Sequence, residues 1–477
     1  MPERPNLVFI MADDHAAHAI SAYGSRVNQT PNLDRLAAEG ARCDAVFCTN
    51  SICSPSRASI LTGTYSHVNK VTSIYSQFDH ATPTYAGVLR AHGYATALFG
   101  KWHLGEGPRS LPRDFDAWQI FPGQGEYHDP VMITKDGSRR VRGYATDIVT
   151  DLSLDWLAGR DPARPFCLMV HHKAPHRPWQ PDAKHRHLYP VGSIPEPDTL
   201  CDDYATRGNA ARSARMTIAD DLTPGDVKEE VPPDLRAADR RVERTRWNYQ
   251  RYLRDYLQCV QSIDDNVGRL LDYLDGAGLA ENTVVVYTSD QGFFLGDHGW
   301  YDKRFIYEES LRMPFLIRWP AEIRAGSRTD EIVTNVDFAA TFVDICGLDP
   351  NVVLPGQQGR SFRRLLAGEQ VGDWPRSMYY RYWEHDDPNH HVWAHYGVRT
   401  HTHKLVYFYA DGLGTDGSAN TRYPPEWELY DLRADPLELH NVAADPAQAA
   451  IRAELETELL RLQRHYADEP YPGVDEG

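Results

Sequence analysis

Cys53 lies in a short segment whose residue types could carry out chemistry. Ser54 can cap a helix and Pro55 can occupy its first turn, so the sequence predicts a helix over residues 55–62. Cys53 would then lie at the helix N-terminus, where unpaired amides favour an anion, and Arg57 could fold back to hold that anion. A buried structural cysteine is the alternative. A thiolate phosphatase does not fit, because its phosphate loop needs a longer spacing than the three residues between Cys53 and Arg57.

Two pairs of oxygen-bearing side chains follow predicted strands. Asp13 and Asp14 come after the strand expected at residues 7–11, and Asp290 and Gln291 come after another buried apolar run. Carboxylate and amide oxygens suit a hard cation such as Ca²⁺ or Mg²⁺ better than zinc or copper. For Asp13 and Asp14 taken alone, a capped turn is the simpler interpretation.

Cationic side chains follow two further predicted strands. Lys101 and His103 come after residues 95–99, and a group rich in histidine comes after residues 166–170. In an open α/β sheet the carboxyl ends of the strands face one crevice, where ligands bind. One polar strand end would be ordinary, because turns are polar, but four of them indicate a common site. The second cationic group comprises His171, His172, Lys173 and His176.

A sheet must bring these residues together, and short apolar runs alternating with helical patterns predict one. The expected fold class is α/β, with a large, mainly parallel sheet covered by helices on both sides. The longest helix is predicted from about residue 242 to 274, where apolar residues recur with helical spacing. The charged segment 202–241 before it is expected to be a surface excursion or lid. The predicted strands are residues 7–11, 95–99, 166–170, 283–288 and 314–318.

A change in composition near residues 368–375 suggests a domain boundary. We expect a catalytic domain over residues 1–370 and a smaller C-terminal α+β domain, with an antiparallel sheet and a closing helix, over residues 371–477. The G-x-G-x-x-G motif at residues 412–417 is interpreted as a loop, because the prolines at 424–425 cannot continue a nucleotide-binding helix. In this domain the strands are expected at residues 377–383, 394–399 and 404–409, and the helix at residues 447–465.

Composition excludes several classes of partner. The formal net charge is −17, from 67 acidic and 50 basic residues, which disfavours nucleic acid as a ligand. An anionic substrate would therefore need a local cluster of cations. No apolar run approaches the length needed to cross a membrane, and the N-terminus as written has no signal-peptide pattern, so a cytoplasmic location is expected.

The motifs together resemble type I sulfatases, a family with an alkaline-phosphatase-like fold in which a cysteine is oxidised to formylglycine. The resemblance is carried by the sequence Cys-Ser-Pro-Ser-Arg at residues 53–57, which continues into Leu-Thr-Gly at residues 61–63. It extends in order through residues 6–14, 100–105, 174–176 and 289–303, and so covers the large domain.

The resemblance implies a metal site and a sulfate pocket. A Ca²⁺ or Mg²⁺ ion would be held by Asp13, Asp14, the modified Cys53, Asp290 and Gln291. Many members carry asparagine where Gln291 stands; glutamine keeps the amide oxygen on a longer arm. Besides Cys53, the catalytic residues around the sulfate would be Arg57, Lys101, His103, His176 and Lys303.

The implied mechanism uses the hydrated aldehyde, which carries two hydroxyls on one carbon. One hydroxyl, deprotonated with help from Asp290, would attack sulfur, and His176 with Lys303 would protonate the leaving alcohol. His103 would then take the proton of the second hydroxyl and so expel sulfate. Cysteine itself has no second hydroxyl, so an enzyme that generates formylglycine is an expected partner.

The substrate expected from local resemblance is a carbohydrate sulfate. Residues 171–178, 194–204 and 292–309 resemble bacterial sulfatases of the N-acetylglucosamine-6-sulfatase type, so a glucosamine 6-sulfate is the first candidate. Ordinary surface and sheet positions are the alternative for the residues that could line the pocket mouth. Those residues are Trp179, His385, His390, His391, His395 and Arg399.

Two other functions remain open at this point. A phosphoester or phosphonate monoester hydrolase on the same scaffold would share the metal and the nucleophile. A non-catalytic protein that binds anionic glycans would keep Cys53 as a thiol. Relative rates on sulfate and phosphate esters would separate the sulfatase from the first alternative, and a formylglycine at position 53 would separate it from the second.

Overall fold

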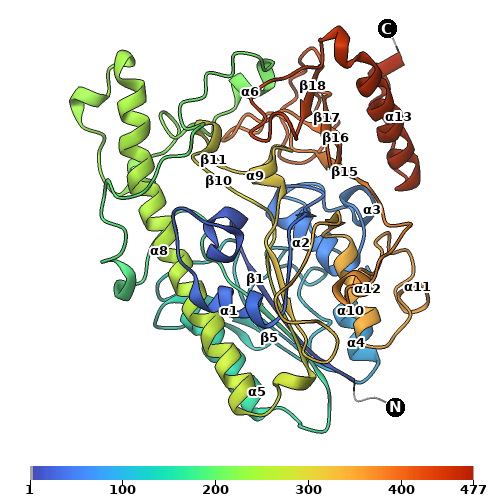
Figure 1. Cartoon of the computed structure of the whole chain (residues 1–477). Helices are drawn as coiled ribbons and strands as arrows, with labels where there is room; N and C mark the ends of the chain where they lie inside the picture. Colours follow the sequence, from blue (N-terminus) through green and yellow to red (C-terminus); the bar gives the residue numbers. More distant parts are fainter. Residues whose placement is uncertain (1–3, 476–477) are drawn as a thin grey trace.

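Five parallel strands form the centre of the large sheet in the computed structural model, which describes residues 4–475 (Figure 1). Nearly every residue in these strands is buried, as expected for a sheet covered on both faces. In spatial order they are β9 (Thr283–Ser289), β1 (Asn6–Ala12), β8 (Phe166–His171), β4 (Ala95–Lys101) and β5 (Ala117–Phe121).

Antiparallel pairs extend the sheet at both edges, so the ten-stranded sheet is mixed. The five strands predicted from the sequence in the large domain are all present, and the last of them, β12, is antiparallel to its neighbours. Beyond β9 come β12 (Phe315–Arg318), β2 (Ala41–Cys43) and β13 (Ser327–Thr329). Beyond β5 come β6 (Val131–Thr134) and β7 (Gly137–Arg140).

Helices cover the two faces of the sheet, as β1 illustrates. Leu7, Phe9 and Met11 point into one apolar core, whereas Val8 and Ile10 point into the other. The first core is covered by α2 (Cys53–Thr62), α4 (Tyr85–Ala91) and α10 (Asp337–Ile345). The second is covered by α1 (Pro31–Glu39), α5 (Ala145–Gly159) and the long helix α8 (Arg241–Gly276) (Figure 1).

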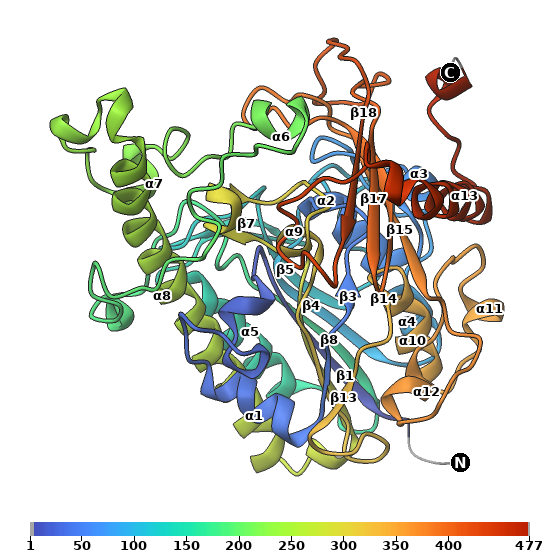
Figure 2. The same ribbon diagram turned by 45° about the horizontal axis from the view of Figure 1, so that its top comes forward.

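A four-stranded antiparallel sheet lies beyond the carboxyl edge of the large sheet, with α13 (Ala449–His465) packed against it (Figure 2). Its last strand was not predicted from the sequence, although Trp427 and Leu429 alternate with acidic residues there, a pattern typical of a half-buried strand. Side chains of both sheets share one apolar core, and the boundary at residue 370 stays a prediction. The strands are β15 (Ser377–Tyr382), β16 (His395–Thr400), β17 (His403–Phe408) and β18 (Glu426–Asp431).

The remaining segments fit the sequence in part. Residues 412–417 form turns, as predicted. The segment 202–241 is not wholly a surface excursion, because Met216 and Ile218 are buried in the two apolar cores. Between residues 4 and 475, no helix combines the length and apolar character needed to cross a bilayer.

Candidate active site

Two adjacent strand ends bring four oxygen-bearing side chains together. Asp13 and Asp14 follow β1, Asp290 and Gln291 follow β9, and the N–H of Asp14 donates to Asp290 Oδ1 at 3.2 Å. The three buried aspartates each offer a carboxylate oxygen, and these oxygens lie within 4.8 Å of one another. Because like charges buried this close repel, the set fits a divalent cation, and oxygen ligands suit Ca²⁺ or Mg²⁺.

Burial and nearby charges push the pKa values of the three carboxyls apart. Burial opposes the ionisation of Asp13, but Lys101 and the other cations outweigh it and hold the pKa of this group well below its usual range. Burial raises the pKa of Asp14 to about 6 against the pull of Lys303. Burial, reinforced by the charge of Asp13, raises the pKa of Asp290 to about 7. A divalent cation among them would favour the ionised form of all three.

Gln291 reaches the same point despite its longer arm. Its Nε2 donates to Asp14 Oδ1 and lies 3.8 Å from Cys53 Sγ. Its Oε1 is buried and has no hydrogen-bond partner within residues 4–475. A rotation of the amide exchanges the two atoms, so the oxygen can be presented to an ion at this point.

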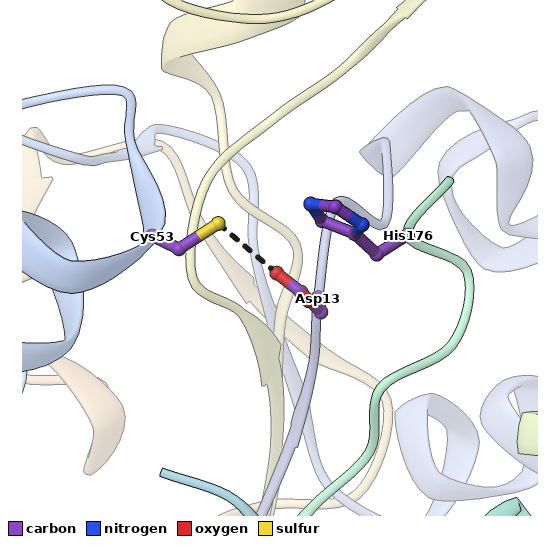
Figure 3. Close-up of side chains that lie close together, drawn as sticks. All are labelled: Asp13, Cys53 and His176. Carbon is purple, nitrogen blue, oxygen red and sulfur yellow. Dashed lines mark hydrogen bonds between the residues drawn. The ribbon is translucent and has the colours of Figure 1, made fainter. Parts of the chain in front are cut away.

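Cys53 faces the carboxylates from the first turn of α2 (Figure 3). Its Sγ donates to Asp13 Oδ1 at 3.3 Å, and a ring nitrogen of His176 completes a group of potential ligand atoms within 4.8 Å. Burial, aided by the charge of Asp13, raises the pKa of the thiol. At neutral pH the side chain is therefore a thiol, and the helix N-terminus does not activate it as a thiolate.

The start of α2 differs from the prediction. The helix begins at Cys53 rather than at Pro55, with Ile52 as an extended N-cap residue. Ser54 does not cap it: its Oγ donates to the carbonyl of His103 at 2.6 Å. Pro55 is tolerated because the first N–H groups of a helix have no intrahelical partner.

Arg57 is buried and ties α2 to the ends of β9 and β4. Its Nε donates to Asp290 Oδ2 at 2.9 Å, and its Nη1 donates to the carbonyl of Lys101 at 2.8 Å. Its Nη2 lies 3.7 Å from Asp13 Oδ1 and has no hydrogen-bond partner in the described part of the chain. Arg57 therefore fixes the site and keeps N–H donors for a ligand.

Two buried lysines pair with the two adjacent aspartates. Lys101 Nζ donates to Asp13 Oδ2 and to Gln124 Oε1, and Lys303 Nζ donates to Asp14 Oδ2 at 2.7 Å. Lys101 is placed by Gly100, whose φ is +107° and where a Cβ would collide with the carbonyl of the neighbouring strand β8. Gln124 was not predicted, because it lies in a loop without a recognisable pattern.

His103 and His176 approach the site from two sides. His103 Nδ1 lies 3.4 Å from Ser54 Oγ, and His176 Nε2 lies 3.8 Å from Asp14 Oδ2. Burial lowers the pKa of both histidines well below the usual range, and the charge of Lys101 adds to the shift. Both rings are thus neutral before an anion binds, and an anion beside them would favour protonation.

Four non-glycine residues at or beside this site adopt the left-handed backbone conformation. Asp14, His103, Asp302 and Arg304 have φ values of 70°, 55°, 78° and 93°. Non-glycine residues in the left-handed region cost energy and tend to occur where function requires them. Two of the four were predicted as site residues.

Trp179 and His395 do not line the mouth of a pocket, which corrects the prediction. Both are fully buried. Trp179 packs against Tyr252 at 4.9 Å between ring centroids, and His395 stacks on Tyr380 at 5.5 Å. Their rings pack against other side chains in the core. The presence of an aromatic residue in a predicted loop or strand does not reveal whether its ring faces the core or a pocket.

His385 and Arg399 are also engaged within the protein. His385 is buried, and its Nδ1 accepts the N–H of Ala394 at 3.2 Å. Arg399 forms two hydrogen bonds of 3.1 Å with the carboxylate of Glu308 and covers the ring of Phe47 at 4.3 Å. Arg399 therefore joins the second sheet to the large domain, and its role in substrate binding stays a prediction.

A charged cluster beside Lys303 was largely missed. Arg304 Nη1 donates to Glu384 Oε2 at 3.3 Å, and its Nη2 lies 3.3 Å from His390 Nε2. His390, which was predicted, also approaches Asp302 Oδ2 at 3.5 Å. The run of charged residues Asp-Lys-Arg at 302–304 could have indicated this cluster. Its partners, however, lie in a loop after β15, which is distant in the sequence and close only in the folded protein.

The fold and this group of buried charges define a hydrolase of anionic esters with an alkaline-phosphatase-like fold. The profile of the sulfatase family matches residues 5–348, so the chain belongs to the sulfatase family and is a sulfuric ester hydrolase. The profile of the C-terminal region of N-sulphoglucosamine sulphohydrolase matches residues 296–465.

Individual relatives and solved structures are similar to the chain over nearly its whole length. The chain is 42% identical to N-acetylglucosamine-6-O-sulfatase of Bacteroides thetaiotaomicron, over 98% of this chain and 87% of that protein. It is similar to the structure of BT4656 bound to its substrate D-glucosamine-2-N,6-O-disulfate, with a TM-score of 0.89, 40% identity and coverage of 99% and 100%. A phosphonate monoester hydrolase of Silicibacter pomeroyi, at 24% identity, TM-score 0.74 and coverage of 98% and 96%, shares the fold.

Loss of one carboxylate should remove metal binding without unfolding the protein. Because a ligand that binds only the folded state stabilises it by mass action, Ca²⁺ at 100 times its Kd should add about 2.7 kcal/mol to the free energy of unfolding. Asp14→Asn should abolish this increase, since Asp14 supplies one of the three clustered oxygens. Thermal melts with and without Ca²⁺ or Mg²⁺ measure it. An unchanged increase in Asp14→Asn would place the ion elsewhere, and stoichiometric zinc in the purified protein would refute the assignment.

Proposed function

We propose that this sulfatase removes the 6-sulfate of a glucosamine-type sugar. The observation that carries the proposal is the continuity of the sulfate site with the buried polar cluster of Arg304, Glu384 and His390, which begins one residue after Lys303. Such a cluster supplies the hydrogen bonds that sugar hydroxyls require and that a simple aryl or alkyl sulfate would leave unused. The similarity to an N-acetylglucosamine-6-O-sulfatase supports the same substrate class.

The nucleophile in this proposal is formylglycine formed from Cys53 by a maturation enzyme. Members of the family use this residue and a divalent metal, and the raised pKa of the Cys53 thiol argues against direct attack by a thiolate. Hydrated formylglycine supplies two hydroxyls on one carbon, so one can attack sulfur and the other can drive the expulsion of sulfate.

The proposed metal is Ca²⁺ or Mg²⁺. Asp13, Asp14, Asp290, Gln291 and the residue at position 53 would hold it, and it would supply Lewis-acid stabilisation of charge on the sulfate oxygens. The clustered carboxylate oxygens and the unpartnered Oε1 of Gln291 support this set.

The charged side chains around the pocket complete the proposed mechanism. Arg57, Lys101 and Lys303 stabilise negative charge on the sulfate, and a buried site strengthens their effect. Asp290, which the cation would keep ionised, accepts the proton of the attacking hydroxyl. His176 donates a proton to the leaving alcohol, and His103 accepts one from the second hydroxyl.

Arg304→Gln should impair hydrolysis of the sugar sulfate and leave hydrolysis of a simple sulfate ester nearly unchanged. We expect kcat/KM on glucosamine 6-sulfate to fall about 10- to 100-fold, the scale of one or two lost charge-assisted hydrogen bonds. The same variant should hydrolyse a small aryl sulfate at nearly the normal rate, because that substrate does not reach the cluster. Steady-state kinetics on both substrates measure the difference.

Arg399→Gln is the matched control, since Arg399 pairs with Glu308 away from this cluster and should leave the ratio between the two substrates unchanged. Equal losses on both substrates for Arg304→Gln would contradict the sugar assignment. Preference for a matching phosphate ester would favour the phosphonate-hydrolase alternative, and a glycan-binding protein would hydrolyse neither substrate.

A further inference from the structure

Lys173 is a buried lysine beside the active site that no step above uses. It follows β8 in the same loop as His176, and its carbonyl accepts the N–H of His176 at 3.1 Å. Its side chain and backbone are only 3% exposed. The position is thus fixed by the loop that also places a proposed proton donor.

The Lys173 ammonium group has no counter-ion in the described chain. Lys101 and Lys303 pair with Asp13 and Asp14, but the side chain of Lys173 forms no hydrogen bond or ion pair within residues 4–475. Its ammonium lies 4.8 Å from the ring centroid of Tyr127, a cation–π contact that offsets only part of the cost of burying a charge. An anion that is absent from the protein itself would complete the pairing.

The surroundings of Lys173 place it on the His176 side of the pocket. Tyr127, which carries the cation–π contact, also donates its hydroxyl to the carbonyl of His176 at 2.7 Å. Burial, together with the charge of Lys101, lowers the pKa of Lys173 to about 8, and the charge of Asp13 opposes this shift. The ammonium therefore lies in the same electrostatic environment as the proposed sulfate ligands.

We propose that Lys173 is an additional cation of the sulfate pocket, whose ammonium group binds an oxygen of the substrate's sulfate ester. The inference rests on the proposed placement of the ester among Lys101, His176 and Lys303. Two features carry it: the side chain is almost fully buried, and within residues 4–475 its charged group makes a direct contact only with an aromatic face. A buried cation without a carboxylate costs stability, so its presence is explained when the substrate is its counter-ion.

Lys173→Met tests this role, because methionine keeps the length of the chain and removes the charge. In the mature enzyme, the inhibition constant of inorganic sulfate against aryl sulfate hydrolysis should rise about tenfold, the scale of one charge-assisted hydrogen bond. Lys173→Arg should restore most of the affinity. The Tm of Lys173→Met should be equal to or above that of the parent, since an unpaired buried charge is removed.

Two further variants distinguish failure of this inference from failure of the proposed placement of the sulfate ester. Lys184→Met removes a lysine that pairs with Asp147 and Asp265 outside the site, and it should leave sulfate inhibition unchanged. Lys303→Met should weaken sulfate binding if the ester lies where we place it. A loss in Lys303→Met with none in Lys173→Met would overturn this inference alone, as would a lower Tm with unchanged sulfate inhibition in Lys173→Met. No loss in Lys303→Met would overturn the placement of the ester itself.

Discussion

Cys53→Ala should abolish turnover, and Cys53→Ser should stop the reaction after one cycle. Removal of a nucleophile costs about a million-fold in kcat in serine hydrolases, and a loss of that order is expected for Cys53→Ala. Serine can still attack sulfur, but its single hydroxyl cannot expel sulfate from the same carbon. Intact-mass spectrometry should therefore find one sulfate retained per Cys53→Ser chain after exposure to substrate.

The fold should survive both changes, because the thiol makes one hydrogen bond in the site, to Asp13 at 3.3 Å, besides its 3.8 Å contact with Gln291. Cys48→Ala is the matched control: Cys48 is also buried, but its Sγ contacts Ser51 and the carbonyl of Leu311. This variant should keep full activity. Fully active parent enzyme that shows only unmodified cysteine in the peptide containing position 53 would refute the formylglycine mechanism.

The strand ends alone were sufficient to predict that polar residues gather at one edge of the sheet, whereas the assignment of metal and sulfate residues came from the resemblance to type I sulfatases and stays a prediction. A run such as residues 7–11 has no polar interruption, so it must be buried, and the polar residues after it must emerge at the edge of the sheet. Asp13 and Lys101 meet for this reason, although they are 88 residues apart. Helix α2 could be predicted, but not its first residue, because Ser54 bonds to His103 instead of capping.

The substrate pocket could not be predicted in the same way. Its residues lie in loops, where side-chain direction depends on contacts between distant segments. The direction of the Arg304 side chain depends on a backbone φ of 93°. Its partner Glu384 lies in the region that the sequence analysis assigned to the C-terminal domain. Trp179 and His395 have the residue types of sugar-binding sites, yet both pack inside the protein. Residue type alone does not distinguish a ring that stacks on a sugar from one that stacks on Tyr380.

His176→Ala and His103→Ala should fail at different steps of the reaction. The alcohol of a sugar is a poor leaving group, and without His176 it lacks its proton donor. On the sugar substrate kcat should therefore fall about 10³-fold, within the range of general acid catalysis. An activated aryl sulfate needs no such proton and should lose far less. His103→Ala should slow the release of sulfate from the enzyme on both substrates, because the later step does not involve the alcohol.

The two variants therefore differ in what accumulates as well as in rate. Rapid quenching followed by intact-mass spectrometry should show sulfated enzyme in His103→Ala and unsulfated enzyme in His176→Ala. Both rings lie at the nucleophile: His103 Nδ1 is 3.4 Å from Ser54 Oγ, and a ring nitrogen of His176 is within 4.8 Å of Cys53 Sγ. The division of their roles therefore rests on the proposed mechanism and is what these variants test. His176→Gln keeps a polar side chain in place and should be as impaired as His176→Ala on the sugar, because it cannot transfer a proton near neutral pH. Equal losses on both substrates in His176→Ala, with sulfated enzyme trapped in neither variant, would show that the two roles are wrongly assigned.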